Sequence, residues 1–410
     1  MGLSAGQKRV QSLVRAALGA LARLCLFALS FLTPRDESLW VFGSNGGEAF
    51  SDNSKYLFQY TAAEREHVRA VWLSRSEVVV AELGEAGYEA HRTESFRGRW
   101  ISLRAGTAFV SHGMPDVNRW CSGGARTVVL WHGVALKRIG WDGYKRRRLD
   151  EKLKGLLKEK LFDRYDWLIV PSEAMVEPFS SAFHMPPERI LSLGYPRNDA
   201  LTGALPAEVG SEADSDDEYG EFRELREEET TILYAPTKHP ETGRRAADHL
   251  RLAELDEWLA EHEAHLLLKP HPAEPIDLGG GFSRIVEVPG GLDVYPLLEH
   301  ADVLLTDYSS LYFDYLLLDR PVAFYPFDLE AYRSTRGFYL EYDEVTPGPV
   351  ATDFEGLLDV LDGVLDDDEF ADERAAVRER FLQPATARRC EAVCDRFDPE
   401  AATPNPTSAR

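Results

Sequence analysis

Residues 301–327 read ADVLLTDYSSLYFDYLLLDRPVAFYPF, and this stretch indicates the fold most clearly. Its two apolar runs, 301–307 and 321–326, have the length of buried strands. The segment 308–318 between them has the length and spacing of a helix. A strand, a helix and a second strand in this order predict a parallel sheet with helices on both faces.

The same alternation extends away from this segment in both directions. The second half of the chain has further predicted strands at 231–237, 264–272 and 283–289 and a helix at 250–262. The first half has predicted strands at 38–45, 67–74, 107–113, 126–133 and 166–172. The two series predict an α/β protein with two Rossmann-like domains, whose ligands lie at the carboxyl ends of the strands.

Composition divides the chain further. The stretch 206–229 holds 11 acidic residues among 24 and only two arginines, which is typical of a solvated linker or insertion. We therefore predict a helix over 1–35, a first Rossmann-like domain over 36–205 and an acidic linker over 206–229. A second Rossmann-like domain follows over 230–375, and a C-terminal helix and tail occupy 376–410.

The charge balance excludes one class of partner. The chain carries 69 acidic and 46 basic side chains, a formal net charge of −23, whereas a nucleic-acid-binding protein needs cations to offset phosphates. We interpret the excess as a solvated acidic surface. One hypothesis is adaptation to high salt, which predicts unfolding on dialysis into low salt.

The four cysteines show no disulfide framework. Cys390 and Cys394 are spaced to share a helix face, but no second Cys or His pair follows to complete a zinc site. Reduced, buried thiols are the better interpretation, and the sequence indicates no metal site.

Residues 8–32 form an apolar run that Arg15 and Arg23 interrupt, so no stretch of about 20 apolar residues is available to span a bilayer. No small-residue cleavage site follows, which argues against a signal peptide. A basic amphipathic helix in the membrane interface fits best. The alternative is a helix packed on the protein itself.

Histidines follow two of the predicted strands. His132, in Trp131-His132-Gly133, is positioned to act as a general base near neutral pH. A buried structural histidine is the alternative, and His112 competes for the same role. A basic stretch then follows in this acidic chain, and it predicts a solvated face or a contact with anionic lipid or a polyphosphate acceptor. Its prominent members are Lys137, Arg138, Lys145, Arg146, Arg147 and Arg148.

Phosphate ligands are predicted at three other strand ends. Arg197 could bind a phosphate with two hydrogen bonds, or pair with Asp199 in a turn. Lys269 and His271 lie in a loop stiffened by prolines, which suits a phosphate contact or a purely structural loop. The segment 306–310 opens a helix, where hydroxyls and free N–H groups would bind an anion or simply cap the helix.

These motifs occur in one order along residues 38–380. The order is FSDNSKYLF, WHGVALKRIGWD, GYPRND, ILYAPT, LLLKPHP, ADVLLTDYSSLYFDYLLLDRPVAFYPFDLEAY, RGFY and PGP. The series resembles the CDP-glycerol glycerophosphotransferase family, the enzymes of teichoic acid priming and polymerisation. The resemblance implies a GT-B fold, with an acceptor domain and a CDP-donor domain facing across a cleft.

The resemblance also implies a reaction and a set of site residues. Glycerol phosphate, or a related alditol phosphate, would pass from a CDP donor to a hydroxyl of a lipid-linked or polymeric acceptor, releasing CMP without a further cofactor. The implied catalytic residues are His132, His271 and Asp142. The implied donor-binding residues are Arg197, Thr306, Ser309 and Ser310, beside Lys269.

Two other functions stay open from the sequence. A GT-B glycosyltransferase that uses a nucleotide-sugar donor shares the same cleft and anion site. A non-catalytic, nucleotide-binding peripheral membrane protein is the second. We expect a peripheral protein at the cytoplasmic face of the cell membrane.

Overall fold

The computed structural model describes residues 5–144, 165–206, 209, 216–238, 246–271, 274, 276 and 278–400. These residues divide into two compact units. Unit 1 comprises 5–132, 165–168 and 394–400, and unit 2 comprises the described residues of 133–144 and 169–393. The segment 206–229, where the sequence predicts a domain boundary, lies inside unit 2.

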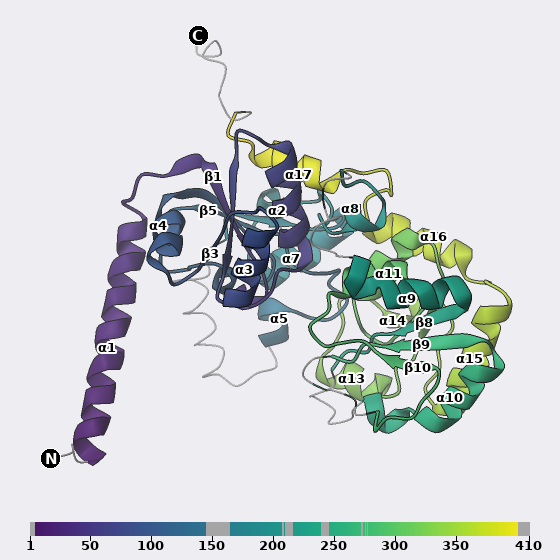
Figure 1. The fold of residues 1–410 in the computed structure, drawn as a ribbon. Helices are drawn as coiled ribbons and strands as arrows, with labels where there is room; N and C mark the ends of the chain where they lie inside the picture. The colour runs from purple at the N-terminus through teal and green to yellow at the C-terminus, as the bar shows by residue number, and fades with distance from the viewer. Residues whose placement is uncertain are drawn as a thin grey trace, which may run out of the picture. The chain divides into compact units, whose positions relative to one another are not determined.

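The first sheet confirms the predicted alternation of strands and helices (Figure 1). Its seven strands run in the order β3-β2-β1-β4-β5-β6-β7. Trp40, Val41 and Phe42 of β1 are fully buried, as expected where helices cover both faces of a parallel sheet. The strands are β1 (Asp36–Gly43), β2 (Arg69–Ser74), β3 (Ala90–Arg92), β4 (Ala105–Val110), β5 (Arg126–Val129), β6 (Trp167–Ile169) and β7 (Ile190–Leu191). The helices of unit 1 that connect them are α2 (Asp52–Glu64), α3 (Glu77–Glu85) and α4 (Phe96–Arg104).

The register of the central strands places three strand ends side by side. Gly43 of β1 pairs with Val110 of β4, and Val110 pairs with Val129 of β5, all in parallel. The residues that follow these strands, 44–45, 111–112 and 130–132, therefore meet at one edge of the sheet. This edge is where ligands bind in open parallel sheets.

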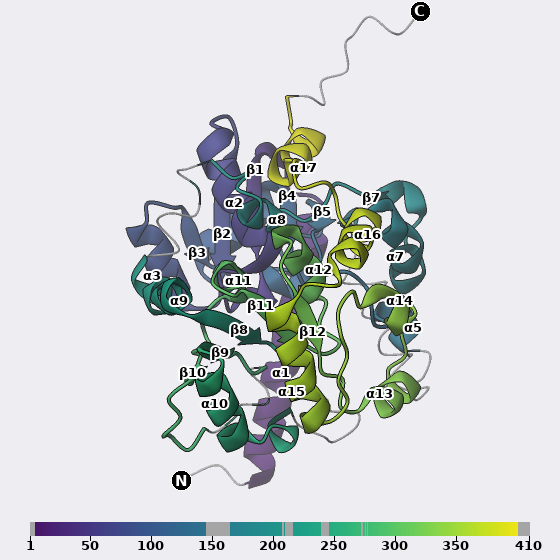
Figure 2. The ribbon, with the colours of Figure 1, turned by 90° about the vertical axis from the view of Figure 1, so that its right-hand side faces the viewer.

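The second sheet lies within unit 2 and is also parallel, in the order β10-β9-β8-β11-β12. Alternate strand residues such as Ile232, Leu266 and Leu305 face one core. Helices α10 (Leu252–Glu261) and α15 (Phe354–Asp366) complete this core (Figure 2). Phe324 faces the other side, where the Tyr312 ring packs on it with centroids 5.1 Å apart. The strands are β8 (Thr230–Tyr234), β9 (Ala264–Leu268), β10 (Ile285–Glu287), β11 (Val303–Thr306) and β12 (Val322–Phe324).

Further helices complete unit 2. They are α5 (Gly140–Tyr144), α7 (Val176–Phe183), α8 (Asn198–Leu201), α9 (Asp216–Glu228), α10 (Leu252–Glu261), α11 (Val294–Glu299), α12 (Leu311–Tyr315), α13 (Leu329–Thr335), α14 (Tyr342–Val345), α15 (Phe354–Asp366) and α16 (Ala371–Phe381). The final helix, α17 (Arg389–Phe397), begins in unit 2 and ends in unit 1. Helices α15, α16 and α17 together account for most of residues 354–397.

Two predicted segments differ from the structure. Residues 216–228 form α9, not a solvated loop, because Tyr219 and Phe222 are buried against unit 2 on one side of an otherwise acidic helix. The predicted helix over 308–318 is shorter. It begins at Leu311 and changes to a 3-10 turn over Leu316–Leu318.

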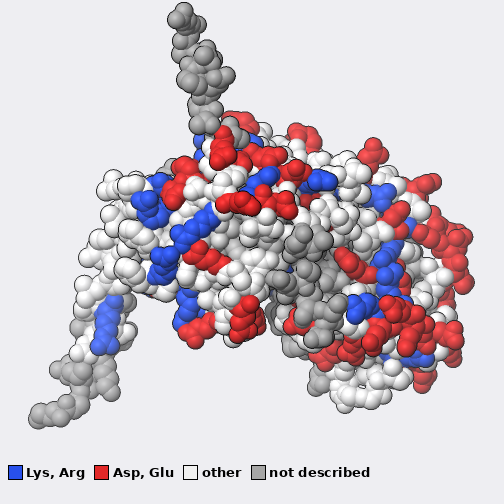
Figure 3. Space-filling view, turned by 45° about the horizontal axis from the view of Figure 1, so that its top comes forward, with Lys and Arg blue, Asp and Glu red and all other residues white. Residues whose placement is uncertain are grey.

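The chain begins with the long helix α1 (Ala5–Ser30). Among the described residues, no helix combines the length and the apolar content that crossing a bilayer requires. Acidic side chains are scattered across the face shown in Figure 3, with lysines and arginines interspersed. The acidity is therefore a property of the surface.

Candidate functional site

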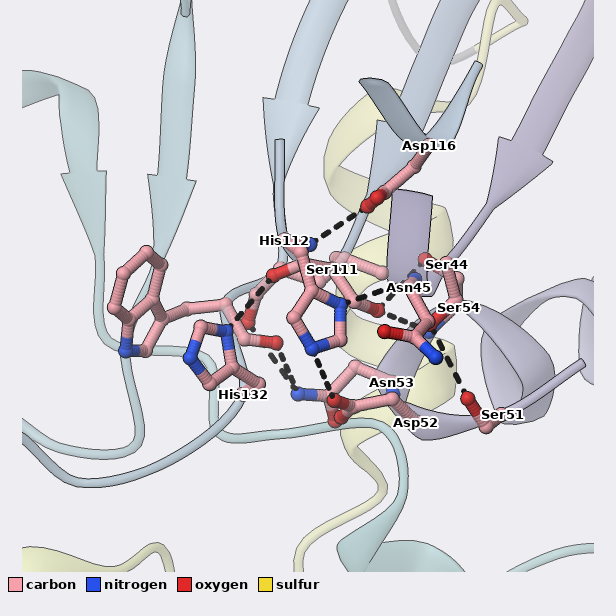
Figure 4. Close-up of polar contacts among 12 residues, drawn as sticks. Ser44, Asn45, Ser51, Asp52, Asn53, Ser54, Ser111, His112, Asp116 and His132 are labelled. Atoms are coloured by element: carbon pink, nitrogen blue, oxygen red, sulfur yellow. Dashed lines mark hydrogen bonds and ion pairs between the residues drawn. The ribbon is translucent and has the colours of Figure 1, made fainter. Parts of the chain in front are cut away.

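His132 lies at the carboxyl edge of the first sheet, in unit 1 (Figure 4). Its Nδ1 lies 3.3 Å from the Ser111 carbonyl oxygen, which can only accept a hydrogen bond. The proton of the neutral ring therefore sits on Nδ1, and Nε2 carries the lone pair that can accept a proton. This is the arrangement that a general base requires.

The backbone before His132 is strained and is held by α2. Trp131 has a φ of +57°, in the left-handed region that bulky residues rarely adopt. The buried Asn53 donates a hydrogen bond of 2.8 Å from Nδ2 to the Trp131 carbonyl. The Trp131 ring stacks on the His132 ring with centroids 4.1 Å apart. Strain of this kind concentrates at functional sites, where the surroundings enforce it.

His112 also belongs to this edge. Its ring lies almost parallel to the His132 ring, at a centroid distance of 4.5 Å and an angle of 12°. Its Nδ1 accepts a hydrogen bond from the Asn45 N–H, and its Nε2 lies 3.7 Å from a carboxylate oxygen of Asp52. The two histidines that compete in the sequence are thus neighbours in the structure.

Unit 2 begins with Gly133, which contacts the serine turn before α12. A Cβ at position 133 would overlap the Oγ of Ser310, and the φ of +155° also favours glycine there. The Tyr195 hydroxyl donates a hydrogen bond of 2.8 Å to the Gly133 carbonyl. Within unit 2, Gly133 is therefore packed directly on the predicted phosphate turn.

Arg197 is part of a buried ion pair in unit 2. Its Nη2 lies 2.6 Å from Oδ2 of Asp314, and the two side chains are 4% and 1% exposed. The Tyr295 hydroxyl donates to the same carboxylate oxygen at 2.5 Å, and the guanidinium lies over the Tyr295 ring at 4.4 Å. Arg197 is therefore held rigidly, close to Gly133.

His271 is partly buried near two lysines of unit 2. Burial lowers the pKa of its imidazole, and Lys238 and Lys137 lower it further, while Glu274 opposes them. The imidazole is therefore neutral at pH 7 in the absence of a ligand. The positive charges of Lys238 and Lys137, in contrast to burial, also favour an anion beside this imidazole.

Three of the predicted phosphate ligands make hydrogen bonds within unit 2. The Lys269 ammonium donates to the carbonyls of Pro289 and Gly290, at 2.7 and 3.3 Å. The buried Thr306 hydroxyl donates to the Ala235 carbonyl. Ser309 Oγ accepts the Leu311 N–H at 3.3 Å, so it caps α12.

The segment after Gly133 pairs with residues 337–339. Lys137 forms an isolated antiparallel bridge with Phe338, and the Arg138 N–H donates to the Gly337 carbonyl. Asp142 is buried and accepts a hydrogen bond of 2.8 Å from the Tyr339 hydroxyl, and burial together with this carboxylate raises the pKa of that phenol. Asp142 thus joins the first motif to the RGFY motif.

The predicted site and the observed site differ in two ways: four predicted residues lie outside the described ranges, and two residues of the site were not predicted. Lys145, Arg146, Arg147 and Arg148 lie outside the described residues. Asp314 and Tyr295 were missed, because nothing in the sequence links Arg197 to a carboxylate 117 residues away. Within the described ranges, no group of three or more His, Cys, Asp or Glu side chains could hold a metal ion. Cys390 and Cys394 are buried thiols, whereas Cys25 is exposed.

Comparison with known proteins identifies relatives across this whole arrangement. Residues 25–397 match the family model described as CDP-glycerol:poly(glycerophosphate) glycerophosphotransferase. A teichoic acid glycerol-phosphate transferase of Staphylococcus aureus is 30% identical over 374 residues, which cover 85% of this chain and 88% of that protein. A teichoic acid poly(glycerol phosphate) polymerase of Staphylococcus epidermidis is 30% identical over 333 residues, which cover 77% of this chain. The match spans only 44% of that longer polymerase.

A solved structure supports the same relationship. The structure of the wall teichoic acid polymerase TagF superimposes with a TM-score of 0.74 and 25% sequence identity. The superposition covers 98% of this chain and 99% of that one. The predicted α/β, GT-B-like fold is confirmed.

Proposed function

This chain belongs to the CDP-glycerol:poly(glycerophosphate) glycerophosphotransferase family, and from that premise we propose the details of its reaction. It transfers glycerol phosphate, or a related alditol phosphate, from a CDP-linked donor to a hydroxyl group. The acceptor is a lipid-linked or polymeric chain, and CMP is released. The donor is a substrate, and the reaction uses no separate cofactor.

One observation carries this proposal: Gly133, the residue after His132, packs against the serine turn of the second sheet. Gly133 leaves no room for a side chain beside Ser310, and Tyr195 holds the Gly133 carbonyl. His132 is the residue immediately before Gly133. A proton-accepting imidazole is therefore attached to the same short loop that borders the anion-binding turn.

The proposed chemistry begins at His132. Its Nε2 removes the proton of the acceptor hydroxyl, while Nδ1–H stays hydrogen-bonded to the Ser111 carbonyl. The hydroxyl oxygen forms a bond to the phosphorus that carries the alditol, and the bridging bond from that phosphorus to the CMP phosphate breaks. The proton on His132 then passes to solvent.

Charge stabilisation comes from unit 2. Phosphoryl transfer depends mainly on positioning and on neutralising the phosphate oxygens. Lys137 and Lys238, which lie near His271, supply positive charge suited to the donor diphosphate, and Ser309 and Ser310 are the further ligands that we propose for it. Arg197 is held by Asp314 in the same unit. Lys269 and Thr306 donate to backbone carbonyls there, and Asp142 accepts a hydrogen bond from the Tyr339 hydroxyl.

Helix α1 supports a peripheral position at the cytoplasmic face of a membrane. Its buried Ser30 and its Phe27, which contacts Trp120, form the side that packs on unit 1. The opposite side carries apolar residues at spacings of four, three and eight, which place them on one face as in an interfacial helix. These residues are Val14, Leu18, Leu21 and Leu29, with exposed fractions of 52%, 61%, 58% and 49%.

Helix α4 adds a second surface suited to lipid. Phe96 and Trp100 share one face of the helix and are 89% and 50% exposed. Arg97 and Arg99 flank them, although each also pairs with a glutamate. Exposed aromatic side chains beside basic ones are typical of the interface with anionic lipid headgroups.

A donor screen tests the proposed reaction. The full chain is incubated with membrane extract and either CDP-glycerol or UDP-sugars, and CMP or UDP release is measured with mass analysis of the lipid product. CMP release that His132→Ala lowers by on the order of 100-fold supports the proposal. UDP release alone would establish a glycosyltransferase, and tight CDP binding without turnover would establish a non-catalytic protein.

A further inference from the structure

The His112 ring stacks on the His132 ring, although the proposed reaction uses only His132. We propose that His112, fixed by Asn45 and Asp52, is a positioning residue that keeps the His132 ring in its proton-accepting orientation. The inference rests on the proposed role of His132 as the base. His112 itself transfers no proton in the reaction.

The first step is the anchor at one ring nitrogen of His112. Its Nδ1 accepts the Asn45 N–H at 3.2 Å, which ties this edge of the ring to the backbone after β1.

The second step is the anchor at the other nitrogen. Nε2 of His112 lies 3.7 Å from Oδ2 of Asp52, and Figure 4 shows the carboxylate beside that edge of the ring. The other oxygen of Asp52 accepts the Asn53 N–H at 2.7 Å, so the carboxylate is fixed at the start of α2. Asp52 adopts this geometry at a φ of +64°, an uncommon conformation for a residue other than glycine.

The loop that carries His112 is held from the opposite side. The buried Asp116 carboxylate accepts the N–H groups of His112, Gly113 and Gly46, and burial raises its pKa. The charged or titratable groups facing His112 from the packed elements of unit 1 are thus Asp52, Asp116 and His132. Both ends of the ring and the backbone behind it are constrained.

The consequence for His132 follows from the rings that pack on it. Its Nδ1 lies 3.3 Å from the Ser111 carbonyl oxygen, at the long end of the hydrogen-bond range. The rings of His112 and Trp131, at centroid distances of 4.5 and 4.1 Å, restrict its rotation. A displacement of about 1 Å in a catalytic group can cost about 100-fold in rate, so this packing should appear in kcat.

Kinetics of the full-length enzyme with CDP-glycerol and membrane acceptor test the proposal. His112→Ala removes the ring, whereas His112→Phe keeps a stacking ring without nitrogens. We expect kcat to fall about 10- to 100-fold in His112→Ala and clearly less in His112→Phe, with the KM for the donor unchanged within about twofold in both. The matched control is His67→Ala, an exposed histidine of unit 1 that pairs with Asp398 and should retain wild-type kcat.

A double-mutant cycle tests the anchor. Asp52→Asn should lower kcat in the wild-type background but add nothing in the His112→Phe background, where no Nε2 is present. A kcat of His112→Ala within twofold of wild type would overturn the proposal. So would an equal loss from Asp52→Asn in both backgrounds, or a loss confined to the donor KM.

The same assays separate this proposal from the one on which it rests. Thermal unfolding of each variant shows whether it is folded, and His112→Phe conserves the volume of the ring if His112→Ala is unstable. Wild-type turnover in His132→Ala would show that His132 is not the general base, and it would overturn both the proposed function of His132 and this inference. Loss in His132→Ala together with wild-type kinetics in both His112 variants would overturn the inference alone.

Discussion

Removing the negative charge of Asp314 should destabilise unit 2 by a large and calculable amount. Asp314→Asn conserves shape and still offers an oxygen to the Tyr295 hydroxyl, but it leaves the Arg197 guanidinium without its carboxylate. The two side chains are 1% and 4% exposed and lie 2.6 Å apart, so solvent cannot replace the lost partner. Breaking a buried pair on one side costs about 3–5 kcal/mol.

The expected change is measurable by thermal unfolding. For a unit of this size, each kcal/mol shifts Tm by about 2–4 °C, so Asp314→Asn should lower Tm by roughly 6–20 °C. Circular dichroism or calorimetry in matched buffer measures this shift. A decrease of less than about 2 °C would refute the reasoning that the charge is desolvated.

A double variant separates stability from function. Arg197→Met in the Asp314→Asn background removes the uncompensated charge, so much of the lost Tm should return. If Arg197 contributes only to folding, turnover should return with the Tm. If Arg197 also contributes to donor binding, as proposed, turnover should stay low although the double variant is stable.

Four further results are expected. Donor binding should add up to about one proton to His271, because the pKa of His271 is lowered in the free protein and a bound diphosphate would raise it. Calorimetry in buffers of different ionisation enthalpy should show this proton uptake, and His271→Ala should abolish it. Donor affinity should therefore rise as the pH falls below neutrality. Gly133→Ala should lower kcat about 100-fold by displacing the loop, and Ser310→Gly in the same chain should restore part of that loss; no restoration would argue against the steric cause. Glutamates at Leu18 and Leu21 should abolish flotation with anionic vesicles while turnover on a water-soluble acceptor is retained. Dialysis into low salt should lower Tm if the acidic surface is an adaptation to high salt, and full stability there would reject that hypothesis.

The sequence predicts the sheets well because buried parallel strands have a clear pattern. Short apolar runs ending in polar residues correspond to β1, β4, β5, β9 and β11. The same pattern places His132 correctly at a strand end. The pattern also predicts that His112 follows a strand. The register of β4 and β5 explains why the rings of His112 and His132 meet.

Composition misleads where a few apolar residues lie in an acidic stretch. Tyr219 and Phe222 are three residues apart, which is a helical signal, yet the eleven carboxylates around them dominate the prediction of a linker over 206–229. A sequence motif also does not show which way a side chain points. Lys269 and Thr306 follow strands as phosphate ligands would, but their polar atoms bond to backbone carbonyls.

The anchoring of α17 bears on how the protein can be shortened or tagged. The fully buried Asp199 carboxylate accepts the backbone N–H groups of Arg389 and Cys390, at 3.0 and 2.7 Å, and also pairs with the Arg389 guanidinium. A chain that stops before residue 389 would leave the Asp199 carboxylate without these donors. Affinity labels therefore belong beyond residue 400, and a premature stop late in the reading frame should behave as a folding defect.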